Sequence, residues 1–315
     1  MNTVNVIYKV ITIFLLICAG YAARKLKWID DRMSRGLSQL VICGAQPFMI
    51  VGKVIAIPSS RENIITGGII LLISFAVHLI LGVLGFVFAR PIKDIGERKI
   101  SEFSLLFVNC GFAGIPLLEA AFGSRGAFWC AVYVIAYNLI QWSYGMVLLG
   151  RADPSIRMNF KKAILNFGTI PCIIGMVLFA TGLGEKIPAP VTDAMNILGS
   201  LCTPLTMIII GGIVATIPIK KLFTDAKVYY ICAVKLLVLP LIVTFLGKAL
   251  GLADVYVIFA AMMAALPTAA NSGVFAEKYD ICPQYASHLV GMSTVLSAIT
   301  IPAIVYLAQR ILTLW

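Results

Sequence analysis

The amino-acid sequence predicts an all-α protein that crosses a membrane many times. Of its 315 residues, 60% are hydrophobic and only 12% are charged, whereas soluble domains contain about 25% charged residues. Apolar runs of roughly 20 residues, the length that spans a bilayer, follow one another along the chain. The net charge of +11 comes from basic residues in the short connections between these runs. This pattern is typical of cytoplasmic loops and does not indicate a nucleic-acid partner.

Ten apolar runs are candidates for transmembrane helices. In chain order they are residues 4–22, 36–57, 64–89, 101–121, 126–149, 163–183, 193–216, 228–250, 254–276 and 285–309. The first run is followed by basic residues without a small-residue cleavage site, so we expect a first span and no secretory signal peptide. The fourth and ninth runs are interrupted by glycine, asparagine and proline.

The basic residues concentrate in alternate connections. If the first connection is cytoplasmic, the loops of that side contain Arg24, Lys25, Lys27, Arg32, Arg35, Arg90, Lys93, Arg98, Lys99, Arg151, Arg157, Lys161, Lys162, Lys220, Lys221, Lys227 and Lys278. The opposite loops contain only Arg61, Arg125 and Lys186. Because Lys and Arg stay on the cytoplasmic side, we expect a multi-pass protein of the plasma (cytoplasmic) membrane with both termini outside.

The two halves of the chain show a weak internal repeat. The stretch LSQLVICGAQPFMIVGKV (37–54) aligns with MNILGSLCTPLTMIIIGG (195–212) when Pro47 is matched to Pro204. Pro116 and Pro267, in the fourth and ninth runs, are separated by nearly the same number of residues. Five spans in each half would give the halves opposite orientations. We therefore expect a first five-helix repeat (1–150), a short cytoplasmic linker (151–162) and a second, inverted repeat (163–315). The alternative is that prolines are simply common in membrane helices.

The interrupted runs are predicted to form a binding site. Proline removes a backbone donor, and unpaired backbone is tolerated at membrane depth only where protein or water surrounds it. Paired broken helices in inverted repeats mark the midplane site of many transporters, and the freed helix N-termini favour anions. We expect a break over Gly111 to Pro116 that is stabilised against a second break near Pro267.

The candidate substrate-binding residues flank these two breaks or lie on the fifth run. They are Asn109, Gly111, Gly114, Pro116, Pro267, Asn271, Ser272, Asn138 and Gln141. Substrate contact and structural capping are both open for Asn109, whereas capping is favoured for Asn271 and Ser272. The glycines would let the two breaks approach each other. Further helix breaks are expected at Gln46, Pro47, Thr203 and Pro204.

Few ionisable residues lie deep in the apolar runs. Ser74, His78 and Lys235 form a candidate support or coupling site, although His78 could be a packing residue and Lys235 could snorkel to the cytoplasm. Glu119 is expected to be solvated, and a solvated or snorkelling role is expected for Lys53. No aspartate pair occurs in an apolar run, which disfavours sodium/proton antiport. No HExxH zinc motif and no intramembrane aspartate pair is present, which disfavours an enzyme. No cofactor is predicted; coupling to H⁺ or Na⁺ remains open.

Four stretches resemble the auxin efflux carrier family. They are NCGFAGIPLL (109–118), YNLIQWSYG (137–145), ALPTAANSGVFAEKYD (265–280) and STVLSAITIP (293–302). This family includes the plant PIN-type auxin carriers and bacterial members, some of them associated with malonate metabolism. The resemblance extends over essentially the whole chain.

The resemblance implies a fold similar to bile acid symporters and sodium/proton antiporters. Spans 1, 2, 6 and 7 would form a scaffold that dimerises, and spans 3–5 and 8–10 a mobile transport domain in which helices four and nine cross at Pro116 and Pro267. Asn109 matches the family asparagine that faces the substrate anion. The large loop of the long plant carriers is absent, which argues against auxin itself as the substrate. The implied function is elevator-type transport, and more specifically efflux, of a small organic anion. The alternatives are cation-coupled uptake and sodium/proton antiport.

Overall fold

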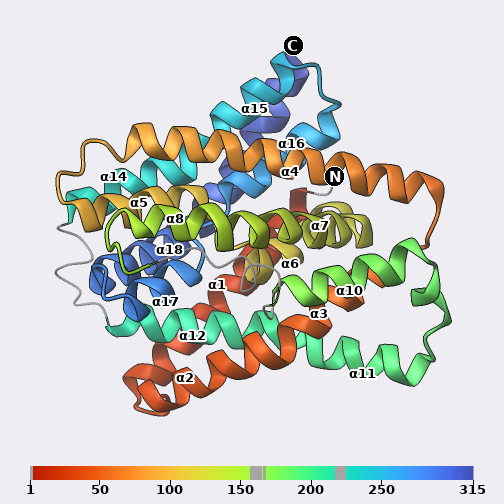
Figure 1. Cartoon of the computed structure of the whole chain (residues 1–315), viewed down its shortest axis with the longest axis horizontal. Coiled ribbons are helices and arrows are strands. Elements are labelled where there is room, and N and C mark those ends of the chain that lie inside the picture. Colours follow the sequence, from red (N-terminus) through yellow and green to blue (C-terminus); the bar gives the residue numbers. More distant parts are fainter. Residues whose placement is uncertain (1–2, 157–164, 166–167, 217–224, 315) are drawn as a thin grey trace. The chain divides into compact units, whose positions relative to one another are not determined.

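The computed structural model describes residues 3–156, 165, 168–216 and 225–314 (Figure 1). Within these residues every regular element is a helix, and the one β-type contact is an isolated bridge. Arg157, Lys161, Lys162, Lys220 and Lys221, which were assigned to cytoplasmic loops, lie outside the described part of the chain.

The helices confirm a polytopic membrane protein. Seven described helices are long and apolar enough to cross a membrane: Val4–Lys25, Asp31–Ile55, Arg61–Phe88, Ser124–Gly150, Ala189–Thr216, Ala226–Ala249 and Pro283–Leu314. Three shorter apolar helices, Cys110–Phe122, Thr169–Ala180 and Asp254–Ala265, coincide with the remaining predicted spans. The inverted ten-helix topology itself stays a prediction.

The chain divides into two compact units. Among the described residues, the first unit consists of three segments, which are the residues up to Leu72, Cys110–Leu139 and the residues from 165 to Gly212. The second unit consists of Ile73–Asn109, the residues from Ile140 to 156 and the residues from Ile213 onward. Each unit therefore draws on both halves of the sequence, and α4 (Arg61–Phe88) contributes residues to both.

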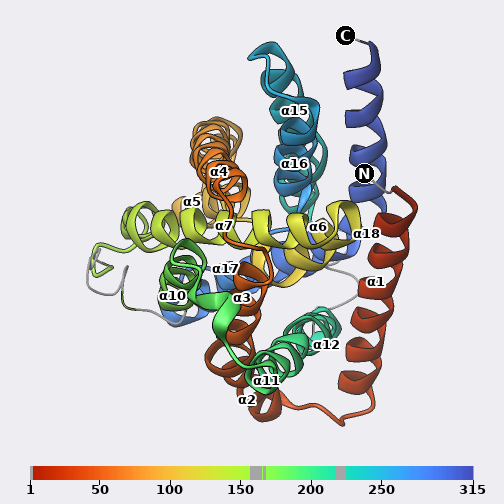
Figure 2. The ribbon, with the colours of Figure 1, turned by 90° about the vertical axis from the view of Figure 1, so that its right-hand side faces the viewer.

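The first unit is built around close helix contacts. Its elements are α1 (Thr3–Lys25), α2 (Asp31–Gln39), the π-helix η1 (Leu40–Ala45), α3 (Gln46–Ile55), the π-helix η2 (Cys110–Gly114), α6 (Ile115–Phe122), α7 (Ser124–Ile140), α10 (Thr169–Ala180), η4 (Leu183–Lys186), α11 (Ala189–Ser200) and α12 (Cys202–Thr216). The helix α3 packs against α10 and α11 (Figure 2). Glycines allow this approach: a Cβ at Gly199 would lie 2.8 Å from Met49 Cα, and one at Gly175 3.3 Å from Val54 Cβ.

The second unit surrounds the long helix α18 (Pro283–Leu314). Its other elements are α5 (Ile95–Leu106), the π-helix η3 (Gln141–Gly145), α8 (Met146–Gly150), α14 (Ala226–Ala233), the π-helix η5 (Val234–Val238), α15 (Leu239–Ala249), α16 (Asp254–Ala265) and α17 (Asn271–Lys278). The helices α5, α14, α15, α16 and α17 all contact α18. The core of the second unit contains the fully buried side chains of Phe103, Phe107 and Phe259.

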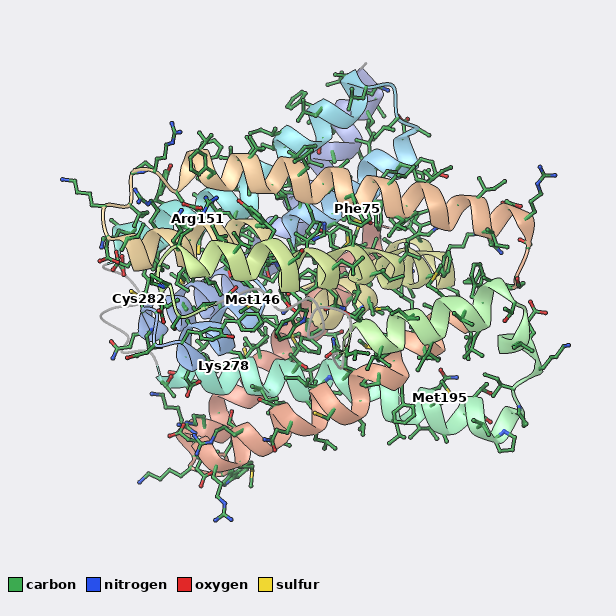
Figure 3. All side chains as sticks on the ribbon, viewed as in Figure 1. Phe75, Met146, Arg151, Met195, Lys278 and Cys282 are labelled. Carbon is green, nitrogen blue, oxygen red and sulfur yellow. The ribbon has the colours of Figure 1, made fainter. Side chains whose placement is uncertain are left out.

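The surfaces of the helices fit a lipid environment. On α4, Leu72 and Leu79 are about 70% exposed, and Phe75, labelled in Figure 3, is exposed as well. Such apolar exposure over many helical turns is unfavourable in water but suits the bilayer.

The scaffold-side breaks lie just before their prolines. In the second predicted span the π-helix η1 precedes Pro47, which lies in the first turn of α3. In the seventh, Leu201 separates α11 from α12, and Pro204 lies in the first turn of α12. The helical backbone continues through the residues before each proline, so the missing proline N–H coincides with a local irregularity of a longer helix.

Candidate functional site

The central feature of the second unit is a pair of helix breaks that bond to each other. The helix α5 ends at Leu106, and α16 ends at Ala265. Val108 and Thr268 then form an antiparallel bridge. The Asn109 N–H donates to the Pro267 carbonyl at 2.9 Å, and the Ala269 N–H donates to the Phe107 carbonyl at 3.1 Å. Each extended segment thus supplies partners that the other lost when its helix ended.

The expected position of the first break is wrong. Gly111 belongs to the π-helix η2 and Pro116 lies in the first turn of α6, whereas the extended residues are Phe107 to Asn109. Pro116 thus lies inside the helical run Cys110–Phe122, where the Phe112 carbonyl accepts from Thr203 Oγ1 at 3.4 Å, and the chain departs from helical geometry several residues earlier. In the ninth predicted span, Pro267 itself is part of the extended segment.

The carbonyl groups at the end of α5 have partners from other elements. Lys235 Nζ donates to the Leu105 carbonyl at 2.7 Å, and Thr268 Oγ1 donates to the Ser104 carbonyl at 3.4 Å. A cation at a helix C-terminus is favoured by the helix dipole. Lys235 is fully buried, so the expectation that it snorkels is wrong.

Asn109 has an unused donor at this site. Its side chain is 3% exposed, and Nδ2 has no hydrogen-bond partner among the described residues. The hydroxyl group of Ser272, which is fully buried on α17, also has no partner in the described part of the chain. Buried polar atoms are normally hydrogen-bonded, and exceptions need an explanation.

The residues after the second break do not cap it. Asn271 Nδ2 donates to Gln141 Oε1 at 3.1 Å, and α17 has no side-chain hydrogen bond at its N-cap. The capping role favoured for Asn271 and Ser272 is therefore not observed. The contact brings Gln141, on η3, next to the residues that follow the second break.

The candidate support residues lie beside the end of α5. His78 Nδ1 is 2.7 Å from the Ser74 carbonyl, and its ring centroid is 6.4 Å from that of Phe107. Ser74 and His78 are both buried, and Lys235 is near enough to His78 for electrostatic interaction. The three residues thus surround the segment from Leu105 to Phe107.

A second group of expected residues gathers within the first unit, at the π-helix η2. Thr203 Oγ1 donates to the Phe112 carbonyl at 3.4 Å. A Cβ at Gly111 would lie 3.6 Å from Gln46 Nε2, which is ordinary contact, so this position does not require glycine. Gly114 is also buried on η2. Pro47 and Pro204 lie in the first turns of the helices that carry Gln46 and Thr203.

Asn138 lies elsewhere in the first unit. Its Nδ2 is 3.9 Å from Cys172 Sγ, and it faces Gly168, where a Cβ would lie 2.7 Å from Asn138 Oδ1. These contacts place Asn138 at the beginning of α10.

Two ion pairs involve residues that were expected to lie in loops or at the solvated ends of spans. Lys99 Nζ and Glu102 Oε1 are 2.6 Å apart, with side chains only 6% and 4% exposed, although Lys99 was assigned to a loop. Their spacing of three residues on a helix is a signal that could have revealed this pair. Lys53 Nζ and Glu119 Oε1 are 2.7 Å apart and partly exposed, whereas a solvated Glu119 and a solvated or snorkelling Lys53 were expected. Within the described residues, no group of three or more His, Cys, Asp or Glu side chains could hold a metal ion.

Comparison with known proteins identifies the family. A family model described as "Membrane transport protein" matches residues 5–159 and 151–305. A "putative malonate transporter" of Rhizobium meliloti is 24% identical over 313 residues, covering 95% of each chain. The "uncharacterized transporter YfdV" of Escherichia coli K12 is 22% identical over 314 residues, covering 95% of this chain and 96% of that one. A "probable auxin efflux carrier component 1b" of Oryza sativa is 28% identical over 135 residues, covering 42% of this chain and 24% of the relative.

These relatives are transporters and not enzymes, and they confirm the resemblance noted from the sequence. The chain belongs to the membrane transport protein family that includes the auxin efflux carriers, and it is a multi-pass membrane transporter.

Proposed function

We propose that this transporter is a secondary carrier for a small organic anion that binds at the paired break of the second unit. The observation that carries the proposal is the buried Nδ2 donor of Asn109, which has no partner among the described residues. Leaving such a donor unpaired costs about 1–3 kcal/mol. A carboxylate, which only accepts hydrogen bonds when ionised, would recover this energy on binding.

The electrostatics of the break favour an anion over a cation. The buried ammonium group of Lys235 lies at the end of α5. The helix α17 begins directly after the second break, at Asn271, so the positive end of its dipole is directed toward the break, while the Ser272 and Gly273 N–H groups donate to the Ala269 and Ala270 carbonyls. The Ser272 hydroxyl supplies a second buried polar atom without a described partner.

A carboxylate such as malonate is the first substrate class to test. The relative named for malonate matches 95% of this chain, whereas the relative named for auxin efflux matches 42%. An auxin-like monocarboxylate is the second class. Both are acceptors of the kind that the Asn109 donor would bind.

The proposed mechanism is alternating access by an elevator-type movement in a homodimer. The scaffold would consist of the helices assigned to spans 1, 2, 6 and 7, and the moving domain of those assigned to spans 3–5 and 8–10. This moving domain differs from the second compact unit, because α6 and α7 pack within the first unit. In a negative-inside cell the membrane potential favours export of a monoanion by about 2.3 kcal/mol per 100 mV, so uniport suffices for efflux. The protein would lie in the cytoplasmic membrane with both termini outside.

Cation-coupled uptake is the second candidate function, and one observation favours it. Glu102 is 4% exposed and paired with Lys99, so the second unit contains a buried carboxylate that could exchange a proton or bind a cation during transport. Sodium/proton antiport would use the same carboxylate. A sodium or pH gradient that drives accumulation of the anion in vesicles would favour uptake over uniport.

The proposal is tested with the full-length protein in liposomes. Uptake and counterflow of malonate, indole-acetate and related carboxylates would be measured for the wild type and for N109A, with N138A as a matched control. Because Asn138 contacts the start of α10, N138A should retain its anion affinity, whereas N109A should lose at least tenfold. Transport of a cation without any carboxylate would overturn the proposal, and unchanged affinity in N109A would assign Asn109 a structural role.

A further inference from the structure

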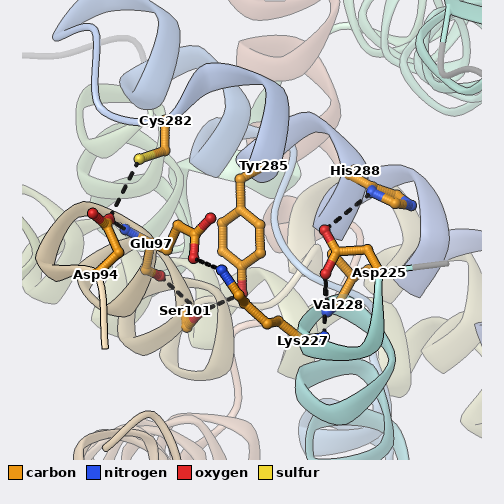
Figure 4. Close-up of polar contacts among 9 residues, drawn as sticks. All are labelled: Asp94, Glu97, Ser101, Asp225, Lys227, Val228, Cys282, Tyr285 and His288. Atoms are coloured by element: carbon orange, nitrogen blue, oxygen red, sulfur yellow. Dashed lines mark hydrogen bonds and ion pairs between the residues drawn. The ribbon is translucent and has the colours of Figure 1, made fainter. Parts of the chain in front are cut away.

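A second polar cluster lies at the N-terminal ends of α5, α14 and α18, within the second unit (Figure 4). Asp94 caps α5 by accepting a hydrogen bond from the Glu97 N–H at 2.8 Å. Asp225 caps α14 by accepting through Oδ1 from the Lys227 and Val228 N–H groups, at 3.1 and 3.4 Å. Carboxylates at these positions satisfy free N–H groups and offset the helix dipole.

Side chains of the same cluster connect the three helices. Lys227 on α14 forms an ion pair with Glu97 on α5. The hydroxyl groups of Ser101, on α5, and Tyr285, on α18, are 2.8 Å apart. Cys282, which precedes α18, lies 3.9 Å from Asp94 Oδ1. Residues more than 100 positions apart in the chain are thus held together by polar contacts.

His288 is the remaining member of the cluster. It lies in the second turn of α18, its side chain is 7% exposed, and Nδ1 is 4.0 Å from Asp225 Oδ2 (Figure 4). The two oxygens of Asp225 therefore have separate neighbours, since Oδ1 caps α14 and Oδ2 faces the imidazole. A neutral imidazole gains little from a carboxylate at this distance, whereas an imidazolium gains an ion pair.

Several charged groups lie in this cluster beside the imidazole. Among the described residues they are the carboxylates of Asp94, Glu97 and Asp225 and the ammonium group of Lys227, and the phenol of Tyr285 and the thiol of Cys282 lie with them. The positive end of the α18 dipole and the Asp225 carboxylate act on a proton at the imidazole in opposite directions. Asp225 is 34% exposed, so solvent can deliver the proton.

We infer that His288 and Asp225 form a proton-binding site that links α18 to α14 when it is occupied. The neutral imidazole takes one proton from solvent and becomes an imidazolium that pairs with Asp225 Oδ2. Histidine is the side chain whose charge ordinarily changes between pH 5 and 8, so occupancy follows the pH on the side of the membrane that this end faces. The inference does not depend on the substrate or the direction of transport.

The test distinguishes the role of Asp225 as the N-cap of α14 from the role of its negative charge as the partner of His288. Asparagine is as good an N-cap as aspartate, so D225N keeps the start of α14 but removes the partner of His288. D94N makes the same change at the start of α5, where the carboxylate does not face His288. Purified full-length wild type, H288N, D225N, D94N and the double variants H288N/D225N and H288N/D94N would be unfolded thermally from pH 5.5 to pH 8.

The expected result is a pH-dependent interaction between His288 and Asp225. H288N should lower Tm by about 2–4 °C more at pH 5.5 than at pH 8, and this difference should disappear in the D225N background but persist with D94N. An equal loss at both pH values, or the same loss in the D225N background, would show a packing histidine and overturn the inference. If H288N does not fold, the single variants D225N and D94N are sufficient for the test. D225N should lose more Tm at pH 5.5 than at pH 8, and D94N should not show this difference. Since no substrate is used, failure here would leave the proposed carrier function untouched.

Discussion

The contact between α1 and α12 allows a sharp test of packing in the first unit. The helices meet at Gly20 and Gly211 with their backbones touching: a Cβ at Gly211 would lie 2.1 Å from the Ile17 carbonyl oxygen and 2.7 Å from the Tyr21 nitrogen. A Cβ at Gly20 would lie 2.1 Å from the Ile208 carbonyl oxygen. Such small-residue contacts are the usual way for membrane helices to approach closely.

The substitution G211A should separate these helices. The obstructing atoms are backbone, so no side-chain rotation can make room, and overpacking of this kind costs about 1–3 kcal/mol. The neighbouring Gly212 has no atom within 4 Å of the added Cβ, which makes G212A a matched control. Both variants gain the same helix propensity, up to about 1 kcal/mol, so this term cancels when the two are compared.

We therefore expect G211A to unfold about 2–10 °C below G212A, from the cost above and the usual dependence of Tm on stability. The assay is thermal unfolding of both proteins purified in the same detergent, with size-exclusion chromatography to confirm that they are folded. Equal Tm values for the two variants would refute the close backbone contact between α1 and α12.

Three further predictions follow from the polar contacts. K99M should destabilise the protein by about 3–5 kcal/mol because it leaves the buried carboxylate of Glu102 unpaired. K53M should cost only about 0–1 kcal/mol because the pair with Glu119 is partly exposed. Similar losses of thermal stability in the two variants would contradict this prediction. K235M should lower stability by about 1–3 kcal/mol because it leaves the Leu105 carbonyl without this donor. The same variant should weaken anion binding in a thermal-shift titration. Unchanged binding would show that the charge of Lys235 does not contribute to anion affinity. Burial, together with the Asp94 and Glu97 carboxylates, raises the pKa of the Cys282 thiol, so less thiolate is present at a given pH and maleimide labelling should be slow. D94N should accelerate labelling of Cys282, read by peptide mass spectrometry, while D225N should not; equal rates in both variants would exclude the effect of Asp94.

The sequence was sufficient to predict the paired breaks but not where the first one lies. Helix-breaking residues in two separated apolar runs predicted that those runs would meet, and the bond between Asn109 and Pro267 confirms it. Proline was taken to mark the break itself, yet Pro116 lies inside the helical run Cys110–Phe122. The extended residues Phe107 to Asn109 carry no local signal, because their geometry is set by hydrogen bonds to a segment far away in the chain.

Lys235 and Glu119 show a second limit. Snorkelling is a rule for a single helix in lipid, and it fails for Lys235 because the carbonyl groups at the end of α5 need a donor. That need exists only once α5 has been interrupted. The partner of Glu119, Lys53, lies 66 residues away, and no periodicity in the sequence connects them. By contrast, the sequence did identify Asn109 as a polar residue near the break, and the side chain is buried there.

The bridge between Val108 and Thr268 holds the two extended segments of the site together through main-chain atoms. Selectivity for a substrate would depend on other atoms, those of the side chains nearby. Both hydrogen bonds of the crossing are made by main-chain atoms, which every amino acid except proline can supply. Around the crossing, Thr268 and Lys235 donate side-chain hydrogen bonds to carbonyls at the end of α5, and Ser293 Oγ accepts from the Thr268 N–H. Side chains that make none of these contacts can be exchanged without loss of the hydrogen bonds that hold the two segments. A family built in this way can change the substrate it accepts by substituting such side chains, while the crossing that positions them stays the same.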